Sequence, residues 1–183
     1  MNRFLFEFVL GEKAEAQYLL SIYFDDDNLS FGVCIVDCTT SQFLFGHIKD
    51  GLDRGALRTV LAQIQPREVV YSQPNLPQQV KKMLRHSPCP PKMSPFPDYP
   101  DVLKAKQQIN HYYAHLPEPL QNMNDFEETK LRATGATLMY LKSVLLDKAV
   151  ISFGNWKEYA VEAGLVKQMV LDAPALRNLE ILE

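Results

Sequence analysis

Residues 29–48 read LSFGVCIVDCTTSQFLFGHI and predict two adjacent strands. From Phe31 to Ile35 the residues at odd and even positions are all apolar or small, so this strand is expected to be buried on both of its faces. A turn at 39–41 then leads into a second strand at 42–48. A strand that is buried on both faces is typical of an α/β sheet with helices on each side.

The flanking segments extend this sheet and add helices. Residues 17–24 form a further apolar strand, so the fold opens with two or three antiparallel strands. Apolar residues then recur at helical spacing from Leu57 to Ile64, with Asp53 as the expected N-cap and Pro66 as the stop. A short strand at 68–71 and a second helix opened by Pro74–Asn75 follow. This order predicts an α/β fold, a mixed sheet flanked by helices.

The second half of the chain is divided by prolines. Half of the twelve prolines lie in residues 87–100, which excludes a helix or a central strand there. A helix is expected from Asp101 to about Tyr113. A longer helix of about 25 residues is expected from Asp125, which together with Glu128 resembles a capping box. Its apolar stripe includes Leu131, Leu138, Leu141, Leu145 and Ala149, and a loop is expected at 156–164.

Composition limits the classes of function. The chain has 183 residues, enough for one large domain or one domain and part of a second. Its net charge of −3 argues against a dedicated nucleic-acid binder but leaves a local basic patch open. Three cysteines, an odd number without zinc spacing, indicate reduced thiols. No apolar run is long enough for a membrane span, so no membrane partner is expected.

The acidic residues near the strand ends allow two interpretations. Two-metal nucleases keep carboxylates at such positions, but turns also need aspartate for hydrogen bonds to the backbone, and turn formation is the favoured interpretation. This group comprises Asp25, Asp26, Asp27, Asp37, Asp50 and Asp53.

Other candidate sites are weaker. His111 and His115 have the i, i+4 spacing of zinc ligands, but Pro117 places them in a fraying helix end, so a solvated pair is expected. The chain contains no glycine-rich phosphate loop.

A small basic helix face is the remaining candidate. Lys81, Lys82 and Arg85 are candidates for weak nucleic-acid contact, with a solvated helix face as the default because no aromatic stacking platform adjoins them.

Four segments resemble the MutS family of DNA mismatch repair proteins. Residues 31–43 are similar to the strand–turn–strand that opens the MutS connector domain, and 66–71 to its Pro-x-Glu-Val strand. Residues 140–147 resemble the first helix after the connector. Residues 169–181 are similar to the family's Leu-Asp…Asn-Leu-Glu signature. The resemblance is greatest to the eukaryotic, mismatch-sensing branch of the family.

This resemblance implies an RNase H-like connector domain at 17–120, a lead-in at 1–16, and at 121–183 the beginning of an all-α lever domain whose first long helix projects away. The family's mismatch-reading wedge, its clamp and its ATPase have no matching residues here, so the chain is expected to be a fragment or a truncated product. No catalytic, cofactor-binding or metal-binding residues are therefore expected; ATP and Mg²⁺ belong to the parent protein.

The implied function is non-catalytic: the connector couples mismatch recognition to the ATPase in the nucleus. The implied partners are a MutS-family heterodimer partner and a MutL-type protein, with mismatched DNA bound only through the absent domains. Two alternatives remain open. One is a divergent RNase H-like nuclease, although residues 71–73 and the first strand lack the required carboxylates. The other is a free-standing α/β interaction domain.

Overall fold

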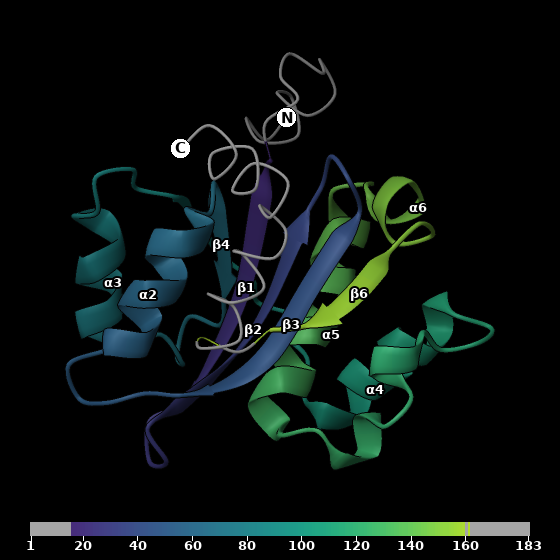
Figure 1. The fold of residues 1–183 in the computed structure, drawn as a ribbon, viewed down its shortest axis with the longest axis horizontal. Coiled ribbons are helices and arrows are strands. Elements are labelled where there is room, and N and C mark those ends of the chain that lie inside the picture. Colours follow the sequence, from purple (N-terminus) through teal and green to yellow (C-terminus); the bar gives the residue numbers. More distant parts are fainter. Residues whose placement is uncertain (1–15, 160, 162–183) are drawn as a thin grey trace, which may run out of the picture.

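A six-stranded mixed sheet forms the centre of the molecule (Figure 1). The computed structural model describes residues 16–159 and 161. The strands lie in the order β5-β4-β1-β2-β3-β6. Their bounds are β1 (Tyr18–Asp25), β2 (Ser30–Asp37), β3 (Gln42–Lys49), β4 (Glu68–Tyr71), β5 (Lys92–Pro95) and β6 (Asn155–Glu158). The helices are α2 (Gly55–Ile64), α3 (Gln78–Arg85), α4 (Val102–Tyr112), α5 (Glu128–Ser143) and α6 (Asp147–Val150), with 3₁₀ turns at Glu118–Leu120 and Met123–Asp125.

The pairing of the strands confirms the α/β class. β1, β2 and β3 form an antiparallel meander. β4 pairs in parallel with β1, β5 with β4, and β6 with β3. The parallel pairs need crossover connections, and α2 and α3 lie in two of these. The order agrees with the mixed, helix-flanked sheet that the RNase H-like resemblance implies.

Helices cover both faces of the sheet, as the two-sided apolar pattern of residues 29–37 predicts (Figure 1). All eight residues of β2 are buried. On one face α2 and α3 pack over a cluster that includes Phe31, Leu57 and Val80. On the other face α4 and α5 pack over a cluster that includes Phe45 and Leu138. β2 is therefore the central strand of a three-layer arrangement.

The position of α5 corrects the expected domain boundary at residue 120. Gly32 in β2 lies directly under the first turn of α5: a Cβ at this position would be 2.1 Å from the backbone carbonyl carbon of Thr129. On the opposite side of α5, a Cβ added at Gly135 would lie 2.6 Å from the Cβ of Ala105 in α4. The helix thus packs into the α/β fold instead of projecting from it, and residues 121–159 belong to the same unit as 17–120. The expected signature at 169–181 lies outside the described residues.

α5 is also shorter than expected and begins differently. It ends at Ser143 after 16 residues. Leu145 adopts a left-handed conformation, with φ of 62°, and is 85% exposed. The predicted capping box is wrong, because Glu127 is the N-cap residue and no side chain caps the helix. Leu131, Leu138 and Leu141 are buried, whereas a helix that projects from the connector would leave this stripe under-buried. The helical period itself holds as far as the end of the helix.

Two further differences concern short segments. Residue Arg54, not Asp53, is the N-cap of α2, again with a left-handed backbone. The loop expected at 156–164 begins with β6, which the sequence analysis missed. Trp156 packs in the cluster under α5 and Tyr159 in the cluster under α2, as expected of positions that alternate between the two faces of the sheet.

Among the described residues, no helix combines the length and apolarity that crossing a membrane would require.

Candidate functional site

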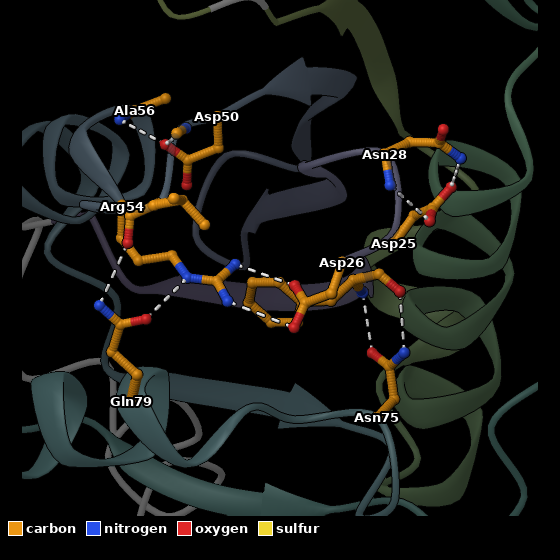
Figure 2. Close-up of polar contacts among 11 residues, drawn as sticks. Asp25, Asp26, Asn28, Asp50, Arg54, Ala56, Asn75 and Gln79 are labelled. Carbon is orange, nitrogen blue, oxygen red and sulfur yellow. Dashed lines mark hydrogen bonds and ion pairs between the residues drawn. The ribbon is translucent and has the colours of Figure 1, made fainter.

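An arginine joins the loops at one end of the sheet, where β1, β3 and β4 finish (Figure 2). Arg54 is 7% exposed and follows β3 in a left-handed conformation with φ of 57°. Its Nη1 and Nη2 atoms donate to the two carboxylate oxygens of Asp26 at 3.0 and 3.3 Å, and its Nε atom donates to Gln79 Oε1 at 3.3 Å. The guanidinium carbon lies 5.6 Å from the centre of the Phe24 ring. A buried guanidinium in this position needs these acceptors, and they come from the β1–β2 turn and from the first turn of α3.

An asparagine reinforces the same end of the sheet. The backbone N–H of Phe24 donates to Asn75 Oδ1 at 2.8 Å, and Asn75 Nδ2 donates to the Phe24 carbonyl at 2.9 Å (Figure 2). Asn75 therefore continues the hydrogen-bonding pattern of β1 with a side chain. Asn75 opens no helix, contrary to the sequence analysis, since α3 starts at Gln78. We call the set Asp26, Arg54, Asn75 and Gln79 the loop clamp.

Four of the five remaining acidic residues at the strand ends support the turn interpretation. Each of the four accepts hydrogen bonds from residues close to it in sequence, which is what turns require. The pairs are Asp25 with Asn28, Asp37 with Thr39, Asp50 with Gly51 and Ala56, and Asp53 with Gly55. Within residues 16–159 and 161, no group of three or more His, Cys, Asp or Glu side chains is placed to hold a metal ion.

The carboxylate of β4 is structural. Glu68 is fully buried, and its Oε1 atom accepts hydrogen bonds from the hydroxyls of Ser94 in β5 and Tyr140 in α5. Lys92 Nζ lies 3.7 Å from the same oxygen. Glu68 lies at the start of β4, whereas the strand ends at Tyr71 without an acid. The glutamate of the Pro-x-Glu-Val segment therefore ties β4 to α5. The motif that contains Glu68 could be recognised in the sequence, but the link that Glu68 makes to α5 could not.

The histidine pair does not form a site. α4 ends at Tyr112, so His111 lies in its last turn and His115 lies beyond the helix. Both are exposed, as expected of solvated residues.

The three cysteines differ in their surroundings. Burial raises the pKa of the Cys34 thiol to about 12, and burial together with Asp37 and Glu68 raises the pKa of Cys38. All three thiols are free, and Cys89 alone is exposed.

The predicted basic residues lie on the outer side of α3. Lys82 and Arg85 are exposed and Lys81 is half-buried. They belong to a longer stretch that the net charge of the chain conceals. Residues 54–97 contain seven of the 19 lysines and arginines but, of the 22 acidic residues, only the buried Glu68. The layer formed by α2 and α3 is therefore positively charged. Contact of Lys81, Lys82 and Arg85 with nucleic acid stays a prediction.

Comparison with known proteins places this arrangement in a family. Residues 17–154 match the family model of MutS domain II. The match runs through α5 and ends just before β6, in agreement with a single unit that includes α5.

Relatives match over most of the chain. It is 27% identical to the DNA mismatch repair protein Msh6 of Homo sapiens, over 93% of this chain and 16% of the relative. Identity to MSH6 of Saccharomyces cerevisiae is 30%, over 82% of this chain and 13% of the relative. MutS of Acetivibrio thermocellus is 29% identical, over 96% of this chain and 19% of the relative. The chain thus spans less than a fifth of the length of these relatives. It belongs to the MutS family of mismatch repair proteins, and its residues 17–154 form a MutS domain II.

Proposed function

We propose that this chain is a non-catalytic connector of a DNA mismatch repair protein, which couples mismatch recognition to an ATPase and presents surface to partner proteins. The family match over residues 17–154 carries this proposal. The geometry supports it, because the end of the sheet where a nuclease would hold its carboxylates contains the loop clamp, with Arg54 placing a positive charge there.

A coupling domain has to transmit displacement without deforming. Three features make this fold stiff: helices packed on both faces, the loop clamp at one end of the sheet, and the Glu68 hydrogen bonds that join β4, β5 and α5. Packed interiors have low compressibility, so a force applied to α5 reaches β2 through the close contact at Gly32.

Partners and cofactors follow from the longer relatives. We assign mismatched DNA, ATP and Mg²⁺ to other domains of a longer protein, since the chain has no glycine-rich phosphate loop and its described residues have no metal-binding cluster. A MutS-family heterodimer partner and a MutL-type protein are the proposed protein partners, and the nucleus is the proposed location. The part of the expected lever segment 121–183 that follows residue 161 lies outside the described residues.

The test is a fluorescence-anisotropy titration of this chain with matched and mismatched DNA duplexes at two salt concentrations. The proposal predicts no preference for the mismatch and at most weak attachment that disappears at the higher salt, because the only available contacts are to phosphates. A mismatch preference that survives the higher salt would require a base-reading element and would contradict the connector role.

A second assay addresses the nuclease alternative. Incubation of the chain with Mg²⁺ and labelled single-stranded and double-stranded DNA is expected to leave the DNA intact. Cleavage that Asp37→Asn abolishes would instead favour the nuclease, although Asp37 serves its own turn in this structure.

A further inference from the structure

A groove lies between the carboxyl-terminal parts of α2 and α3 and the loop that follows α3. Its volume is about 490 Å³, which is within the range of ligand-binding pockets. Leu61 and Ala62 line it from α2, Met83 and Leu84 from α3, and the prolines of residues 88–91 close one end. The groove is thus an apolar channel between two helices, on the sheet face opposite α5.

The rim of this groove is positively charged. Arg58 lines it, and among the lining residues in the described part of the chain there is no aspartate or glutamate. Lys82 and Arg85 are exposed in the last turn of α3, where they also offset the negative end of the helix dipole. Neither α2 nor α3 contains an acidic residue, so no carboxylate of these helices neutralises the rim.

We propose that this groove binds a short acidic peptide segment with apolar side chains, supplied by another protein. Apolar side chains of the segment enter the channel between Leu61 and Met83, and its carboxylates meet Arg58, Lys82 and His86. Amphipathic segments commonly bind in grooves of this kind through regularly spaced apolar anchors. This groove would be the surface that the connector presents to a partner. Only the statement that the segment belongs to a repair protein rests on the proposed function.

Duplex DNA fits this surface less well. Within the fold, Arg54 is engaged by Asp26, Lys92 by Glu68, and Arg58 Nε by the Asp53 carbonyl. Among the described residues, none that lines the groove is a tyrosine, phenylalanine or tryptophan on which a base could stack. An apolar centre surrounded by positive charge complements a segment that carries both apolar and acidic side chains, and a DNA backbone offers only the charge.

Cys89 provides a direct reporter because it is exposed and lines the groove. The thiols of Cys34 and Cys38 are buried, and burial raises their pKa. An alkylating reagent is therefore expected to modify Cys89 first in the folded chain. A segment seated in the groove would slow this reaction.

The probe is a fluorescein-labelled peptide that has leucines at positions i and i+4 and glutamates at positions between them. Anisotropy is expected to rise with a dissociation constant on the order of 10 µM, and saturating peptide should slow alkylation of Cys89. Two control peptides, one with lysines for the glutamates and one with serines for the leucines, should bind at least about tenfold more weakly.

Two matched variants locate the site. Ala62→Glu adds a carboxylate to an exposed position in the groove and should weaken peptide binding at least about tenfold. Ala149→Glu adds the same charge at an exposed position of α6 and should leave binding unchanged. Circular dichroism of both variants verifies the fold.

Three outcomes would overturn the inference: no binding of the acidic peptide by the folded chain, equal effects of the two variants, or binding of duplex DNA in preference to the peptide with the same sensitivity to Ala62→Glu. Each leaves the connector role open, since coupling does not depend on this groove. Loss of coupling with intact peptide binding would contradict the connector role alone.

Discussion

Gly32→Ala should strongly destabilise the chain, because β2 has no space for a methyl group under α5. The added Cβ would lie 2.1 Å from the carbonyl carbon and oxygen of Thr129 and 2.5 Å from the nitrogen of Lys130. All three are backbone atoms of the first turn of α5, so no side-chain rotation relieves the clash. To reach ordinary contact at about 3.4 Å, the helix start must move by about 1.3 Å.

The magnitude follows from what that movement disturbs. Overpacking of a core usually costs about 1–3 kcal/mol. The shift also stretches the hydrogen bond between His47 Nδ1 and Thr129 Oγ1, which is 2.8 Å long, at a cost of about 1 kcal/mol. We expect a loss of about 3 kcal/mol in the free energy of unfolding, a large part of the roughly 5–15 kcal/mol typical of a domain.

Urea unfolding, followed by the fluorescence of the single tryptophan, measures this loss. Trp156 is buried in the cluster under α5 and so reports on the relevant face. Gly55→Ala is the matched control: its Cβ would lie 3.4 Å from the nearest atom, and alanine favours the helix that starts there. Equal stability of the two variants would refute the placement of α5 on β2.

Three more results are expected. Arg54→Ala should lower the free energy of unfolding by about 2 kcal/mol, because the variant loses the bond to Asp26 and keeps a left-handed backbone that alanine disfavours. Arg54→Gly loses the same partner, but glycine tolerates this backbone, so its loss should be smaller by about 1 kcal/mol. Equal losses in urea unfolding would argue against backbone strain. A thiol reagent should modify one cysteine, Cys89, rapidly in the folded chain and all three in urea, and two or more fast thiols would contradict the burial of the others. Burial raises the pKa of Tyr112 and Tyr159 to about 12, so the unfolded chain loses these two phenol protons at a lower pH than the folded chain does. The stability that these groups contribute is therefore complete below about pH 10 and is lost as the pH rises toward about 12. Unfolding curves that do not change across this window would contradict the burial of the two tyrosines.

The central part of the fold could be predicted from the sequence because its strands are buried on both sides. In β2 both parities of the strand are apolar, and the turn residues before β3 are typical of a hairpin. The helix expected from Asp101 to about Tyr113 was also predicted: α4 spans Val102–Tyr112, and Asp101 is its N-cap, accepting a hydrogen bond from the N–H of Lys104.

The missed elements depend on tertiary contacts. β6 has only four residues with a single buried side chain, Trp156, and it pairs with β3 because that indole stacks on Phe43 at 4.2 Å between centroids. The end of α5 was missed because Leu145 continues the apolar period although the chain turns there. A local pattern gives no sign of a left-handed leucine.

The candidate surface was only partly predictable. Lys81, Lys82 and Arg85 were identified as a small basic face, but the net charge of −3 gave no sign of the longer positively charged stretch. The excess of basic over acidic residues in segment 54–97 could have been read from the sequence. Its apolar groove could not, because it arises where α2 and α3 lie side by side on the sheet. The same holds for the loop clamp, whose members come from three loops and from helix α3.

Coupling is tested most directly in a longer relative. Residues 17–159 would replace the corresponding segment of the Saccharomyces cerevisiae MSH6 protein, to which this chain is 30% identical. The purified chimera, with its heterodimer partner, would be assayed for ATP hydrolysis in the presence of matched and mismatched duplexes. If these residues form a connector, the ratio of the hydrolysis rates with the two duplexes should be the same in the chimera as in the unmodified relative assayed beside it. A chimera that binds the mismatch and hydrolyses ATP, but at the same rate with both duplexes, would contradict the coupling role.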